Sequence, residues 1–435
     1  MKGDETVMNR VRLLPFAAGM AVALCQGGAF AAEGGKPYAH YWMSVSTQNM
    51  TMPGMSASEM GMLGGLMGRG GPGMGPQRDL RLQLVSPQAT PRAPEAGHDI
   101  PPGQNMGPML PLLVPEQGRP APMERGETSE RGEMEKPKGR MLIYWGCGDK
   151  VRAGQPRVLD MAKASPADFA RMMSSRQPTH QSPPAPRAGW TYADWPNRDS
   201  QLAVPRDGSL QGGQLVHANF APDIRFNIGA QHDFMAPVEF SSVTGGLADS
   251  IAFQWRSIPT AIGYFSMAMG SGGQGADTVF WSSSEVADMG WGLLDYLSPA
   301  DVRRFIKEKV VMTPETTSCA IPQGIFKNAE GAMLQFIAYG DELNLVHPPR
   351  PADVKQPWQP IWSAKVRLKS TGMLPLGQED NSSRAGRGAL GGRSYTSESR
   401  SQQGRSYTSD QPAARRGGED GVLDKVNKIR GLLPF

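Results

Sequence analysis

The sequence predicts a mainly β protein with two β-sandwich-like modules, each with one short inserted helix, together with disordered linkers and a disordered C-terminal tail. Three observations predict this class. Short segments alternate apolar and polar residues and are bounded by turn residues, as strands of sandwiches are. One strand–turn–helix pattern occurs twice. The remaining stretches are rich in Gly and Pro, 53 and 38 of 435 residues, a composition typical of irregular chain between folded modules.

The first segment, residues 1–32, has the pattern of a cleavable signal peptide. Three basic residues precede the apolar run LLPFAAGMAVALC, and Ala29 and Ala31 then supply the small residues that a signal peptidase needs. The alternatives are lipidation at Cys25 and an uncleaved anchor, although a helix that spans a bilayer needs about 20 apolar residues. The pattern predicts an exported protein, periplasmic or associated with the cell envelope.

Export changes the interpretation of the three cysteines. Cys25 lies within the signal segment, so Cys147 and Cys319 remain in the mature chain. An oxidising compartment favours a disulfide between them, and their even number permits it. Two separate buried thiols are the alternative.

A strand–turn–helix pattern appears in two places. The first copy is MLIYWGCGDKV (141–151) with VLDMAKASPADFARMM (158–173), and the second is TVFWSSSEV (278–286) with LLDYLSPADVRRFI (293–306). In both, Ser-Pro-Ala-Asp starts a helix with Ser at the N-cap and Pro at the first helical position. The likeness predicts an internal duplication. Chance similarity between two helix starts is the alternative.

Aromatic strands upstream extend the likeness. AHYWMSV (39–45) corresponds to AIGYFSMAMG (261–270), and each strand is expected to lead through a glycine-rich connection to the Trp-ending strand of its copy. The second connection is short, GSGGQG (270–275). The first is long and contains NMTMPGMSASEMGMLGGLMGRGGPGMG (49–75). We therefore expect a Gly- and Met-rich loop over about 47–78, between two strands of module 1.

Module 2 contains further strand signals. SIAFQWRSIPTAIGYFSMAM (250–269) alternates apolar residues, places Trp255 before a Pro turn and continues into the next strand. This segment resembles the adjacent core strands of fibronectin type III-like sandwiches, and the resemblance implies a fibronectin/Ig-like sandwich. Further strands are expected over 223–229, 332–340, 343–346 and 364–370.

The predicted organisation has six segments. They are the signal peptide (1–32), module 1 (36–177), a Pro-rich linker (178–215), module 2 (216–376), a disordered low-complexity tail (377–420) and an amphipathic C-terminal helix (421–435). The linker and the tail contain too few apolar residues to form a core.

The last segment has apolar residues at helical spacing, with basic residues away from that stripe. The stripe consists of Val422, Leu423, Val426, Ile429 and Leu433. A short amphipathic helix on a tether suits docking to its own protein, to another envelope protein or to a membrane surface. The sequence leaves these three partners open.

The Met-rich stretch is a candidate soft-metal site. Its candidate ligands are Met50, Met52, Met55, Met60 and Met62, with His40 nearby. Thioethers are soft, uncharged ligands that suit Cu(I), and the stretch resembles the methionine-rich loops of periplasmic copper-handling proteins. A flexible loop without metal is the alternative, because methionine is frequent throughout the chain, at 26 residues.

No catalytic residue and no cofactor other than Cu(I) is predicted. Gly270–Gly275 fits G-x-G-x-x-G, but a strand follows it, which argues against a nucleotide site. Ser282–Ser284 end a strand, and no motif ties a base to them. The net charge of +4 is small for this length and does not predict nucleic-acid binding.

The stretches KGRMLIYWGCG and WSAKVRLKSTGMLPLG resemble exported bacterial proteins of uncharacterised function, and this resemblance implies no activity. The leading hypothesis is a non-enzymatic structural or interaction protein of the cell envelope. The alternatives are a periplasmic Cu(I)-binding protein that uses the Met-rich loop and a hydrolase of envelope polymers.

Overall fold

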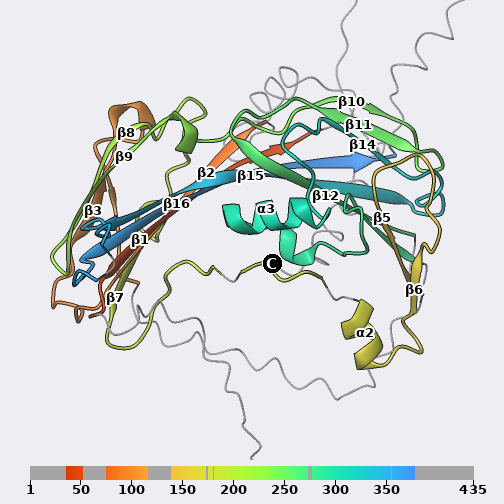
Figure 1. Cartoon of the computed structure of the whole chain (residues 1–435). Helices are drawn as coiled ribbons and strands as arrows, with labels where there is room; N and C mark the ends of the chain where they lie inside the picture. Colours follow the sequence, from red (N-terminus) through yellow and green to blue (C-terminus); the bar gives the residue numbers. More distant parts are fainter. Residues whose placement is uncertain are drawn as a thin grey trace, which may run out of the picture. The chain divides into compact units, whose positions relative to one another are not determined.

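The computed structural model describes residues 36–51, 75–115, 139–172, 175–179, 181–272, 277–353 and 355–377. The described residues belong to one compact unit, Met1–Ser382. They form a mainly β structure of large sheets, which confirms the predicted fold class (Figure 1). The predicted signal peptide, Met52, Met55, Met60, Met62, the tail from residue 378 onward and the C-terminal helix lie outside the described residues.

The largest element is a nine-stranded sheet with the order β6-β5-β13-β12-β15-β16-β1-β2-β7. Its strands are β1 (Ala39–Met50), β2 (Gln77–Ser86), β5 (Arg140–Trp145), β6 (Arg157–Asp160), β7 (Thr191–Trp195), β12 (Ala261–Ser271), β13 (Thr278–Ser282), β15 (Gly331–His347) and β16 (Trp362–Leu376). The pairs β1–β16 and β5–β13 are parallel, and the other neighbours are antiparallel. Strands from both ends of the described chain therefore meet at the centre of the sheet.

Two smaller sheets cover one face of the large sheet. The first contains β10 (Phe240–Thr244), β11 (Ile251–Trp255) and β14 (Ser318–Ile321), and the second contains β4 (Met109–Pro111), β3 (Ala96–Asp99), β8 (Gly212–Ala218) and β9 (Ala221–Ile228). One hydrophobic core joins all three sheets. The structure is thus sandwich-like in two places, and strands from both predicted modules share the nine-stranded sheet. The duplication itself stays a prediction.

The opposite face of the large sheet carries α3 (Pro299–Lys307) (Figure 1). Side chains alternate between the two faces of a strand. In β12, Tyr264 and Ala268 point into the three-sheet core, whereas Phe265 and Met267 pack with Phe305 of α3. The helix therefore covers the β12–β15 part of this second face.

Both predicted helix starts are present, at α2 (Pro166–Met172) and at α3. Ser298 is the N-cap of α3, and its Oγ accepts a hydrogen bond from the Asp301 backbone N–H at 3.1 Å. The Asp168 backbone N–H donates to Ser165 Oγ in the same way, at 3.2 Å. Each Ser satisfies a backbone donor that the first helical turn leaves without a partner. Short 3-10 helices occupy Pro102–Gln104 (η1), Ala230–His232 (η2) and Trp291–Leu293 (η3).

Several strands lie where the sequence did not predict them, and β2, β7 and β8 are among them. β2 follows the Met-rich stretch and pairs with β1, so that stretch connects a β1–β2 hairpin rather than leading to β5. β7 lies within the stretch predicted as a linker, 178–215, and β8 begins there as well. The segment QRDLRLQLVS alternates polar and apolar residues, so a strand signal was present for β2. The five residues of β7 are flanked by Pro-rich chain, which hides their pattern.

His98 makes the stability of the sandwich depend on pH. This side chain is fully buried, and its Nδ1 lies 2.8 Å from the Tyr41 hydroxyl. Burial lowers the pKa of His98 to about 3 from its ordinary value of 6.5. The unfolded chain therefore binds this proton more readily than the folded protein does. We expect the free energy of unfolding to fall as the pH falls from about 6.5 towards 3, by roughly 2 kcal/mol between pH 7 and pH 5 from this histidine.

Urea denaturation at pH 7 and pH 5 measures this loss. The matched variant is Tyr41→Phe with His98→Leu, which removes the titrating ring and its buried hydroxyl partner together. Both proteins keep His40 and the carboxylates. Burial lowers the pKa of His40 to about 4, so its titration contributes equally to the two pH dependences. The difference between the two pH dependences therefore isolates His98. An equal loss of stability in the wild type and the variant would contradict the expectation.

Candidate functional site

The β1–β16 part of the second sheet face is polar. Tyr41, Met43 and Val45 of β1 point into the three-sheet core, so the residues between them point to the second face. On β16 the same alternation places three basic side chains on the second face. We call them the cationic cluster: Lys365, Arg367 and Lys369. In the β1–β16 register, Lys365 lies beside Trp42 and Arg367 beside Ser44.

Each lysine of the cationic cluster has a carboxylate partner. Lys365 Nζ lies 2.8 Å from Glu342 Oε2, and both side chains are largely buried. Lys369 Nζ lies 2.7 Å from Asp295 Oδ1, and the Asp295 side chain is exposed. Glu342 belongs to β15, and Asp295 precedes α3. The two ion pairs therefore hold β16 to its neighbours and leave Arg367 between them.

Arg367 is held differently from the two lysines. Its Nε donates to Ser44 Oγ at 2.8 Å, and only 8% of the residue is exposed. The guanidinium carbon lies 4.1 Å from the centre of the Tyr296 ring and 5.3 Å from that of Trp42. Burial lowers the pKa of Arg367, but an arginine remains protonated in proteins. A charged guanidinium is therefore fixed against two aromatic rings.

A connecting segment borders the site. Residues 175–179 and 181–190, which we call the strap, lead from α2 past α3 to β7 (Figure 1). Buried Asp288 accepts from the Arg176 backbone N–H at 2.9 Å, and Asp301 accepts from that of Thr179 at the same distance. Further along, Gln181 Oε1 accepts from Lys365 Nζ at 2.8 Å. The strap is thus anchored beside the cationic cluster.

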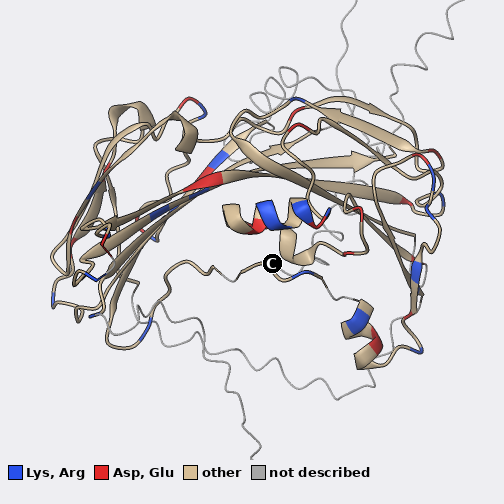
Figure 2. Cartoon of the chain, viewed as in Figure 1, with Lys and Arg blue, Asp and Glu red and all other residues tan. Residues whose placement is uncertain are grey.

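The cluster has one more positive charge than its carboxylates neutralise. Three cations face Glu342 and Asp295, and the next charges on β2, Arg81 and Asp79, pair with each other at 3.6 Å. Elsewhere Lys and Arg are interspersed with Asp and Glu in the view of Figure 2. The arrangement can attract an anion and donate hydrogen bonds to it.

Cys147 and Cys319 form a disulfide, with Cα atoms 5.1 Å apart. Cys147 follows β5 of the large sheet, and Cys319 lies in β14 of the three-stranded sheet. Trp281 Nε1 donates to the Gly146 carbonyl at 3.0 Å beside this link. The disulfide therefore connects the two layers of one sandwich, over 172 residues of sequence.

The candidate copper ligands do not all come together. His40 lies at the start of β1, is buried, and bonds through Nδ1 to Ser363 Oγ at 2.8 Å. Met50 is the last residue of the same strand and is 46% exposed. A strand rises about 3.3 Å per residue, so these two residues lie roughly 30 Å apart. They cannot bind one ion together. A Cu(I) site formed by Met50 with Met52, Met55, Met60 and Met62 stays a prediction.

Ser282 at the end of β13 and the two serines after it make hydrogen bonds within the fold. Ser282 Oγ donates to the Asp288 carbonyl at 2.7 Å, and Ser283 Oγ accepts from the Ser266 N–H at 3.0 Å. Ser284 Oγ donates to the Val286 carbonyl at 2.7 Å. All three are buried. These hydroxyl groups stabilise a tight turn. The glycine stretch 270–275 precedes β13, as expected of a hairpin connection.

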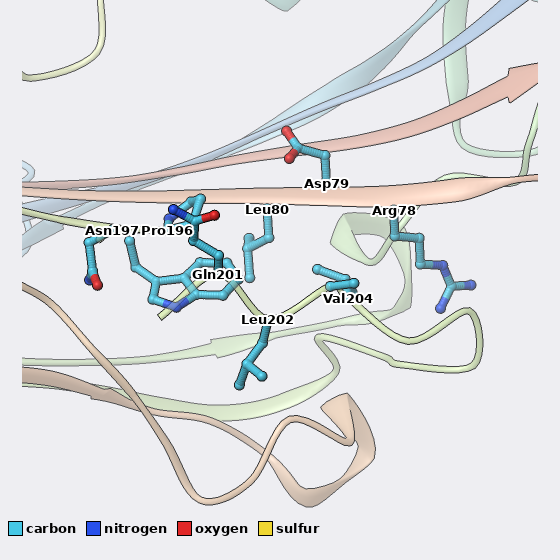
Figure 3. A pocket seen from close by; sticks show the side chains of 10 residues that line it. Arg78, Asp79, Leu80, Pro196, Asn197, Gln201, Leu202 and Val204 are labelled. Atoms are coloured by element: carbon cyan, nitrogen blue, oxygen red, sulfur yellow. The ribbon is translucent and has the colours of Figure 1, made fainter. Parts of the chain in front are cut away.

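A separate hollow of about 350 Å³ lies where β2 and β7 meet the loop after β7. Figure 3 shows Leu80, Val204 and Leu202 on one side of β2 and Asp79 on the other. Arg78 at its rim donates to the Gly208 carbonyl and lies against the Phe234 ring. Arg78 is the one basic residue among the described residues that line the hollow, and Asp79 points away from it, so we take the cationic cluster as the candidate site.

The cationic cluster was not predicted from the sequence, although one signal for it was visible there. The predicted strand 364–370, AKVRLKS, has basic residues at every second position, so they share one face. Its partners could not be found in this way. Trp42, Glu342 and Tyr296 come from three distant parts of the chain, and the local pattern does not show that they meet.

In the described part of the chain, no group of three or more His, Cys, Asp or Glu residues is placed to hold a metal ion. None of its helices combines the length and the apolar character needed to cross a membrane. Comparison with protein-family models, with curated proteins and with solved structures finds no match to this chain.

Proposed function

We propose that this protein is exported and acts without enzymatic chemistry, as an interaction protein that holds a ligand or partner in the cell envelope. The observation that carries the proposal is the Cys147–Cys319 disulfide. Structural disulfides are typical of the periplasm and of secreted proteins and are rare in the cytosol. The signal-like N-terminal sequence supports the same location.

The polar sheet face supports the binding part of the proposal. It presents a charged group that is fixed by Ser44 and by two aromatic rings, on a strand at the centre of the large sheet. Binding groups held by regular secondary structure keep their geometry better than groups on loops. The serine hydroxyls that could have acted as nucleophiles bond to the backbone instead.

Export and oxidation are tested together in a bacterial host that expresses the full chain. We expect the protein in the periplasmic or envelope fraction, with a mass reduced by its N-terminal segment. Cys147 and Cys319 should react with an alkylating reagent only after denaturation and reduction. Full-length protein in the cytosol, with Cys147 and Cys319 both reactive before reduction, would overturn the proposal. A Cys147→Ala, Cys319→Ala variant in the same host controls for the labelling.

The interaction is tested by native size-exclusion of envelope extract solubilised in mild detergent. We expect the protein to elute in a larger species than the purified chain does, and the Arg367→Gln variant to elute with the purified chain. Arg81→Gln is the matched control, because Arg81 lies on the same face but its side chain is 70% exposed. Elution of the wild type at the position of the purified chain would argue against a stable partner.

A further inference from the structure

We propose that Arg367 is the recognition group for a single oxyanion, a carboxylate or a phosphate, carried by the ligand that the polar sheet face binds. This inference rests on the proposed binding function and names the chemistry of its ligand. It follows from the hydrogen-bond donors of Arg367, the charge around it and the rigidity of its surroundings.

The donors of Arg367 are only partly used. A guanidinium has five N–H donors in a planar fork. The Nε–H bonds to Ser44 Oγ, and within the described part of the chain the two Nη atoms donate to no protein acceptor. Neither Nη atom is fully buried, so each keeps a small area in contact with solvent. Four N–H groups therefore have no protein acceptor among the described residues, in a planar fork whose geometry suits carboxylate or phosphate with two parallel hydrogen bonds.

Among the described residues, the three cations of the cationic cluster have only two carboxylates beside them, Glu342 and Asp295. Glu342 is occupied by Lys365 and also accepts from Asn344 Nδ2 at 3.2 Å, and Asp295 is occupied by Lys369. Bringing an arginine this far from water costs free energy unless a partner compensates it. A bound oxyanion would supply the third negative charge of the cluster.

The same two carboxylates limit what can bind. Glu342 and Asp295 lie on either side of Arg367 and repel the additional anionic groups of a ligand that carries several of them. The site therefore favours one oxyanion over a polyanion such as nucleic acid. Because the Asp295 side chain is 72% exposed and Glu342 is almost fully buried, we place the approach to the site on the Asp295 side.

The donor fork is held in place before any ligand arrives. Trp42 and Ser44 are almost fully buried, and both aromatic rings contact the guanidinium. Fixing a long arginine side chain in advance reduces the entropy that binding would otherwise cost. Charge-assisted hydrogen bonds are also stronger in such a partly desolvated place than in water.

The test uses the purified mature protein and two probes, acetate and methyl phosphate, in a buffer without other oxyanions. Calorimetry and the fluorescence of the aromatic residues measure binding, and the melting temperature should rise with probe concentration. We expect saturable binding of one probe at millimolar concentration, and the probe that binds identifies the carboxylate or the phosphate as the natural group. Arg367→Gln should weaken it about tenfold or more, and Arg367→Lys should weaken it less.

Arg81→Gln is the control and should bind the probe as the wild type does. If Arg367→Gln fails to fold, Ser44→Ala replaces it, because removing the Nε acceptor frees the fork and should also weaken binding. The inference is overturned if the wild type binds neither probe, or if Arg367→Gln and Ser44→Ala bind as tightly as the wild type. Export with a closed disulfide but no probe binding would overturn this inference alone. Probe binding by a cytosolic protein would overturn the proposed function alone.

Discussion

Replacing Phe336 with alanine is expected to lower the free energy of unfolding by about 3–5 kcal/mol. Phe336 lies in β15 with 1% of its surface exposed, and it joins the large sheet to the three-stranded sheet. Its ring centre lies 4.7 Å from that of Trp255, 5.7 Å from that of Tyr264 and 5.8 Å from that of Phe240. Removing it leaves a cavity that these large rings cannot fill without moving, so both burial and packing contacts are lost.

Urea denaturation followed by circular dichroism measures this effect. The matched control is Phe169→Ala, because Phe169 lies on α2 and is 40% exposed. We expect the control to change the stability by no more than about 0.5 kcal/mol. A loss below about 1 kcal/mol for Phe336→Ala would show that the aromatic cluster between the two sheets does not behave as a packed core.

The double variant Cys147→Ala, Cys319→Ala is expected to lose about 2–5 kcal/mol of stability. The disulfide closes a loop with a sequence separation of 172 residues. A crosslink over so long a loop removes much conformational freedom from the unfolded chain. It also ties the segment after β5 to β14, where Gly148 N–H donates to the Ala320 carbonyl at 2.9 Å.

Denaturation of the wild type with and without a reducing agent provides the comparison. The reduced wild type should match the double variant, and the reducing agent should not change the variant further. Equal stability of the oxidised wild type and the double variant would mean that the link contributes little to the fold. Even then, the disulfide would still support an oxidising compartment such as the periplasm, because oxidation of the two thiols is measured separately.

The parts of the fold that depend on residues close together in the sequence could be predicted. Ser298, Pro299 and Asp301 predicted the start of α3, because an N-cap hydroxyl and a proline at the first position satisfy the needs of a helix end. The alternation in 250–269 predicted β11 and β12, whose apolar residues fill the core between two sheets.

The arrangement of the strands was not visible, because pairing joins residues that are distant in sequence. β1 was expected to lead through its loop to β5, but its neighbours are β2 and β16. The Arg367 site depends on the same long-range pairing. Ser44 reaches Arg367 only because β1 lies parallel to β16, 323 residues later. No local pattern in either strand specifies this partner.

The place of β16 in the sheet also determines when the protein can fold. β16 lies between β15 and β1, so the first strand of the described chain has no partner on that side until residues 362–376 are present. Contacts between such distant residues slow folding, and unpaired strand edges favour aggregation. A chain that emerges from its N-terminus, whether from a ribosome or through a membrane, therefore exposes β1 for almost its whole passage. The late arrival of β16 therefore favours folding after the whole chain has been synthesised or translocated. Until then, the exposed edge of β1 needs protection from aggregation.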